Sequence, residues 1–75
     1  MAHLENLGSL IHVRFAGRSF DLGLSELDIG PRSSDAHVKR TLARELGVSE
    51  SRLADYVVDR HANGNLTLRP EAVFG

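Results

Sequence analysis

The chain contains no cysteine and no tryptophan, and only two of its 75 residues are proline. Without cysteine it can form neither a disulfide nor a thiolate metal site. The chain also has no excess of either charge, because nine basic and ten acidic residues give a formal net charge of −1. A nucleic-acid-binding domain usually has a clear positive excess, so this balance argues against that class. Long apolar runs are absent too, which excludes a membrane-spanning helix.

The length predicts one small domain. A chain of this size buries only roughly 60% of the surface that it exposes when unfolded. Residues 1–7 have neither the basic start nor the apolar stretch of a secretory signal. We therefore expect a soluble cytoplasmic protein without membrane contact, in which residues 1–9 form an N-terminal tail and residues 10–75 a single domain.

Residues 10–24 predict a β-hairpin. Apolar side chains occupy every second position on both sides of Ala16-Gly17, which is the period of a half-buried strand. A two-residue loop at Ala16-Gly17 joins apolar residues on one face and places a histidine opposite an acid on the other. The predicted pairs are Ile11 with Leu22, His12 with Asp21, Val13 with Phe20 and Arg14 with Ser19.

An amphipathic helix is predicted after a connecting loop over residues 25–32, from which Leu27 and Ile29 are candidate core residues. Ser33 or Ser34 is the expected N-cap, and Gly47 stands where a left-handed C-cap belongs. Apolar residues spaced by four form the predicted buried stripe, namely Val38, Leu42 and Leu46, with Ala43 beside them.

A second hairpin is predicted over residues 56–69, after a turn with one short helical piece over residues 48–53. A three-residue loop, Ala62-Asn63-Gly64, with Gly64 left-handed, pairs Val58 with Leu68 and Asp59 with Thr67. A two-residue loop would set Leu68 against Asp59, which is a poorer match.

The predicted order ββαββ indicates an α+β fold with one helix packed on a four-stranded mixed sheet. In a compact arrangement the last strand lies centrally, parallel to the first and antiparallel to the third, which is the β-grasp layout. The segments IHVRFAGRSFDLGL and SSDAHVKRTLARELGV resemble the opening hairpin and the capped helix of the ubiquitin-like superfamily.

The closing segment, GNLTLRPEAVFG, resembles the C-terminus of the small sulfur-carrier proteins of that superfamily. The resemblance implies that an activating enzyme adenylates the carboxylate of Gly75, which is then thiocarboxylated or transferred to an amine. This chain has Phe74 where those proteins have a second glycine. The alternative is an ordinary chain end, with Val73 and Phe74 packed on the domain.

The sheet face away from the helix is the candidate protein-binding surface. We expect it to present His12, Arg14, Val57, Asp59, Thr67 and Arg69, with Leu10 at its edge. Two arginines flanking Val57 resemble the mixed basic and apolar patch through which ubiquitin-like domains meet partners. The alternative is a solvated face on which Asp21 and Asp59 neutralise the arginines.

The expected function is protein binding without catalysis, through that face or as a modifier activated at Gly75. The four histidines have no metal-ligand spacing, and we predict no cofactor and no catalytic residue. A rival function is a small nucleic-acid or anionic-ligand binder that uses Arg14, Arg69 and the helix cations. We expect a monomer, or a weak homodimer paired through the edge strand at residues 18–24.

Overall fold

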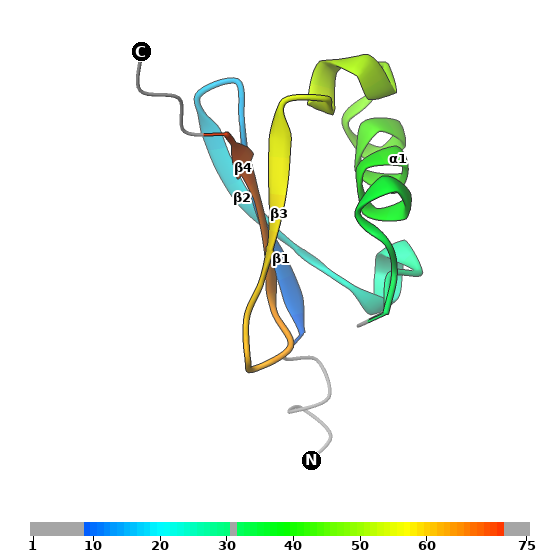
Figure 1. The fold of residues 1–75 in the computed structure, drawn as a ribbon, viewed down its shortest axis with the longest axis vertical. Helices are drawn as coiled ribbons and strands as arrows, with labels where there is room; N and C mark the ends of the chain where they lie inside the picture. The colour runs from blue at the N-terminus through cyan, green and yellow to red at the C-terminus, as the bar shows by residue number, and fades with distance from the viewer. Residues whose placement is uncertain (1–8, 31, 72–75) are drawn as a thin grey trace.

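The structure is a computed structural model that describes residues 9–30 and 32–71. It is an α+β fold in which one helix packs on a four-stranded mixed sheet (Figure 1). The predictions for residues 1–8 and for the tail from Ala72 to Gly75 lie outside the described residues. Within the described part, no helix is long and apolar enough to cross a membrane.

The sheet has the strand order β2-β1-β4-β3. Its strands are β1 (Leu10–Phe15), β2 (Arg18–Gly23), β3 (Tyr56–Arg60) and β4 (Leu66–Pro70). The central strands β1 and β4 run parallel, with Ile11 paired to Leu66 and Val13 to Leu68. Both outer pairs are antiparallel hairpins. The predicted central position of the last strand is confirmed.

The first hairpin has the predicted register. Ile11 pairs with Leu22, and His12 pairs with Asp21. Its two turn residues both have positive φ, 54° at Ala16 and 78° at Gly17. This is the geometry of a type I′ turn, whose twist matches that of the flanking strands.

The second hairpin closes through the predicted three-residue loop. The His61 N–H donates to the Asn65 carbonyl at 2.9 Å, and the Gly64 N–H donates to the His61 carbonyl at 3.0 Å. Gly64 has a φ of 93°, which glycine adopts without a Cβ penalty. Asp59 therefore pairs with Thr67, as predicted.

Helix α1 (Asp35–Leu46) begins and ends at capping residues. The Ser34 hydroxyl accepts the His37 N–H at 3.1 Å, which satisfies one of the N–H groups that the first turn leaves unpaired. Gly47 ends the helix with a φ of 73°. Two short 3-10 helices flank α1 along the chain, η2 (Ser25–Leu27) and η3 (Glu50–Leu53).

The core lies between α1 and one face of the sheet. Its fully buried side chains come from both layers and from η3: Ile11, Val13, Val38, Leu42, Leu53 and Leu68. Each side chain of this kind stabilises the fold by about 1.5–3 kcal/mol when it leaves water. Leu27 and Ile29 are also buried, so their predicted place in the core is confirmed.

Arg60 joins the end of β3 to the start of α1. Its Nη2 donates to the Ser33 carbonyl at 2.7 Å and to the Asp35 carboxylate at 2.6 Å.

Because α1, η2 and η3 all lie on one side of the sheet (Figure 1), no described element covers the other side.

Candidate functional site: the open face of the sheet

The uncovered side, which we call the open face, consists of the residues that alternate with the buried core positions of the strands. Ile11 and Val13 point into the core, so His12 and Arg14 point to the opposite side of β1. The same alternation on β3 and β4 gives Val57, Asp59, Thr67 and Arg69. All six predicted surface residues thus share one face, and their role in binding stays a prediction.

The open face is ordered in rows that cross the four strands. The polar row runs Asp21, His12, Thr67, Asp59, since each neighbouring pair is in register. Both ends of this row are carboxylates, and its centre holds an imidazole and a hydroxyl. A surface with this composition offers hydrogen bonds rather than apolar area to a partner.

The arginine row lies two residues from the polar row along each strand. Arg14 is paired with Ser19, and Arg69 is paired with Val57. Continuing the β1–β4 register by one residue beyond Val13 and Leu68 brings Arg14 beside Arg69. Because β3 is an outer strand, Val57 stands at the end of this row. The prediction that two arginines flank Val57 is therefore wrong.

Only one of the two arginines has an anionic partner. Arg69 Nε donates to Asp59 Oδ2 at 2.6 Å. That hydrogen bond and the positive charge hold the pKa of Asp59 below its usual range, and the same contact raises the pKa of Arg69. Arg14 is exposed and has no ion pair with any residue in 9–30 or 32–71.

Asp21 forms its ion pair with a histidine and not with an arginine. His12 Nδ1 and Asp21 Oδ1 are 2.6 Å apart, and a carboxylate only accepts, so Nδ1 donates. The expectation that Asp21 neutralises an arginine is wrong. The reason is the hairpin register, which sets Asp21 opposite His12 and Ser19 opposite Arg14.

Apolar area on the open face is divided between two places. Leu10 lies at the start of β1 and Val57 lies on β3, and both are half-buried. Polar residues of the middle strands separate them. Over the described residues the open face therefore has no apolar centre. A partner that displaces water from this face would have to make the hydrogen bonds that the water made.

A hollow of about 230 Å³ opens where the β3–β4 turn meets the start of β1. We call it the histidine hollow, and its lining consists of Leu10, His12, Asp21, His61, Asn63, Asn65, Leu66 and Thr67. His61 Nε2 lies 2.9 Å from the Thr67 hydroxyl. The sequence interpretation missed His61, although its position two residues beyond Asp59 could have assigned it to this face.

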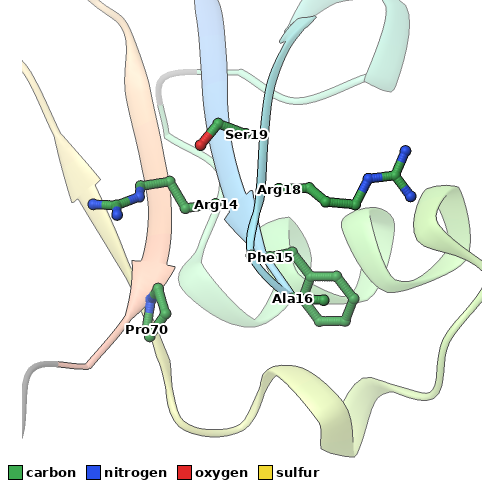
Figure 2. A pocket seen from close by; sticks show the side chains of 7 residues that line it. Arg14, Phe15, Ala16, Arg18, Ser19 and Pro70 are labelled. Atoms are coloured by element: carbon green, nitrogen blue, oxygen red, sulfur yellow. The ribbon is translucent and has the colours of Figure 1, made fainter.

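A smaller hollow of about 140 Å³ lies at the other end of the sheet, beside the β1–β2 turn. Its lining includes Arg14, Arg18 and Pro70. Figure 2 shows the guanidinium groups of Arg14 and Arg18 extending away from each other. The two cations therefore do not converge on a common anion in this hollow.

No protein-family model, curated protein or solved structure matches the chain. In the part of the chain that the structure describes, no group of three or more His, Asp or Glu side chains is placed to hold a metal ion. The functional interpretation therefore depends on the geometry of the open face.

Proposed function

We propose that this protein is a β-grasp domain of the ubiquitin-like superfamily that acts by binding a protein partner through its open face. Three features of the fold support the superfamily assignment. The elements follow the order ββαββ, the first and last strands are central and parallel, and a single α-helix packs on one side of the sheet.

The observation behind the binding function is the uncovered arginine row beside the polar row. Arg14 lies on the central strand β1, is exposed, and has no anionic partner among the described residues. A guanidinium in that position can bind a carboxylate in a bidentate manner. Leu10 and Val57 add apolar contact at the margins of the same face.

Affinity capture with matched charge reversals tests this proposal. Arg14→Glu changes the open face, whereas Arg44→Glu makes the same charge change on the exposed side of α1. We expect the unmodified protein and Arg44→Glu to retain the same partner and Arg14→Glu to lose it. A partner that Arg14→Glu retains in full would refute binding through the open face.

We further propose that Gly75 is the residue at which the protein is activated, as the resemblance of its tail to sulfur carriers implies. Incubation with a candidate activating enzyme and ATP would measure adenylate exchange, and deletion of Gly75 should abolish it. Phe74→Gly restores the paired glycine of the family and should raise the rate. Absence of adenylate exchange with both the unmodified protein and Phe74→Gly would refute this proposal.

The adjacency of Arg14 and Arg69 favours a second candidate, an anionic-ligand or nucleic-acid binder. Two arginines side by side can contact successive phosphates. The described open face has no Phe, Tyr or Trp side chain on which a base could stack. Titration with single- and double-stranded DNA and RNA at low salt distinguishes the two functions, because phosphate binding weakens steeply as salt rises.

A further inference from the structure

Four side chains of the histidine hollow keep a polar nitrogen that makes no hydrogen bond to the described residues, whereas the Asp21 carboxylate in the same lining accepts from His12. Asn65 Oδ1 accepts the Leu10 N–H at 2.9 Å, and Asn63 Oδ1 accepts the Asn65 N–H at 3.0 Å. Only the oxygen of an amide can accept a backbone N–H. Each asparagine therefore has its NH₂ group left over, without a hydrogen bond to the described residues.

The two imidazoles have the same arrangement, with one nitrogen used and one left. His12 donates to Asp21 through Nδ1, which leaves Nε2. His61 contacts the Thr67 hydroxyl through Nε2, which leaves Nδ1. Both remaining nitrogens are donors when the ring is protonated. Four lining side chains, from β1 and from the β3–β4 turn, thus each keep a nitrogen for a ligand, and Asp21 of β2 lies in the same lining.

Charge in the hollow depends on these two rings and on the groups that face them. His12 faces Asp21 on β2 and has Thr67 as its neighbour on β4. His61 lies close enough to Asp59 to help lower the pKa of that carboxyl, which Arg69 already pairs. When both rings are protonated, Asp21 is paired with the His12 cation and Asp59 with the Arg69 cation. The hollow then has no uncompensated negative charge.

The apolar surface that the lining offers to a ligand comes from Leu10, which is half-buried, because Leu66 is buried in the core. An inorganic anion gains nothing from apolar side chains, whereas the methylene groups of a glutamate side chain would cover them. A ligand with an anionic head and a short apolar stem therefore matches both halves of the lining.

We infer that the histidine hollow receives the carboxylate of an acidic side chain of the protein partner. The donors are the two asparagine NH₂ groups together with His12 Nε2 and His61 Nδ1. This inference rests on the proposed function, since it names the chemistry of the partner that docks on the open face. Binding should be tighter at acidic than at alkaline pH, because imidazole changes its charge between about pH 5 and 8.

NMR titration of isotope-labelled protein tests the inference, with a blocked tetraglutamate peptide and a blocked tetraglutamine peptide as probes. We expect the tetraglutamate peptide to shift the His12 and His61 ring signals and the Asn63 and Asn65 NH₂ signals. The shifts should saturate at lower peptide concentration at about pH 5.5 than at about pH 8. The tetraglutamine peptide should leave these signals unchanged.

Asn63→Asp and Asn65→Asp are the deciding variants. Each keeps the oxygen that accepts a backbone N–H and replaces the NH₂ donor by an anion, so the turn is preserved while the hollow is changed. Affinity for the tetraglutamate peptide should fall by at least roughly tenfold in each. Ala36→Asp adds the same charge at an exposed position of α1, on the other side of the sheet, and should bind the peptide like the unmodified protein.

The outcomes separate this inference from the proposed function. NMR shifts confined to Arg14 and Arg69, or unchanged peptide affinity in both aspartate variants, would refute carboxylate binding in the hollow. The open face would still stand as a binding surface. Inorganic phosphate that shifts the hollow as strongly as the peptide would overturn the assignment to a carboxylate side chain. Capture that does not depend on Arg14 would refute the proposed function and not the peptide result.

Discussion

Ala16 should be replaceable by glycine with a gain in stability, because the first turn forces it into a left-handed conformation. Its φ is 54°, and its side chain is exposed. An L-residue in the left-handed region costs about 1–2 kcal/mol. Glycine removes that cost, but it also destabilises the fold by about 0.4–1 kcal/mol because it increases the entropy of the unfolded chain. Ala16→Gly should therefore stabilise the fold by about 0.5–1 kcal/mol.

Ala62→Gly is the matched control in the other turn. Of the described non-glycine residues, only Ala16 and Asp28 have positive φ, so Ala62 has no left-handed strain to relieve. It should lose about 0.4–1 kcal/mol from the entropy of the unfolded chain. Gly17→Ala is the reverse test, because a Cβ there would meet no atom within 4 Å and its cost would be conformational alone.

Thermal unfolding followed by circular dichroism measures all three variants. A change of 1 kcal/mol shifts Tm by about 4–8 °C in a domain of this size. We therefore expect Ala16→Gly to raise Tm by roughly 2–8 °C and Ala62→Gly to lower it by a similar amount. If both substitutions lower Tm equally, Ala16 is not left-handed and the first turn has a different geometry.

Three further changes test the core, the helix cap and the ion pair of the open face. Leu68→Ala removes a fully buried side chain and should cost about 2–5 kcal/mol, which urea unfolding would record. Ser34→Ala removes the N-cap hydrogen bond and should cost about 1 kcal/mol in the same assay. Asp59, whose pKa Arg69 lowers, contributes stability that is present above the carboxyl's unfolded pKa and lost as pH falls through the folded one. Asp59→Asn should therefore flatten the fall of Tm below about pH 4, whereas Asp55→Asn, with no ion pair among the described residues, should not.

The sequence predicted both hairpin registers because each turn strongly restricts the pairing of its strands. Ala16-Gly17 and Asn63-Gly64 each place a glycine where φ is positive, and the alternating apolar residues then select one pairing. The pairs His12–Asp21 and Asp59–Thr67 follow from these local rules. So does the assignment of Leu27 and Ile29 to the core, since they are the two large apolar residues of a mostly polar loop.

Side-chain pairing across strands was harder to predict. Sequence reasoning assigned the right residues to the open face but described Val57 as flanked by two arginines, whereas Val57 lies on the outer strand β3 at the end of the arginine row. The pairing of Asp21 with His12 was predicted from the register, whereas the alternative in which Asp21 neutralises an arginine was wrong, because Asp21 stands opposite His12 and Ser19 stands opposite Arg14. The histidine hollow depends on where the asparagine side chains of a turn point, which alternation along a strand does not encode.

The parallel pairing of β1 with β4 also determines how the chain can fold. The Leu10 N–H reaches a side chain 55 residues away, whereas each hairpin joins residues that are close in sequence. The hairpins can form early, but the core cannot close until the two ends of the domain meet, and the entropy lost in closing so long a loop slows that step. A chain that stops before Leu66 should therefore keep hairpin-like fluctuations without a cooperative unfolding transition.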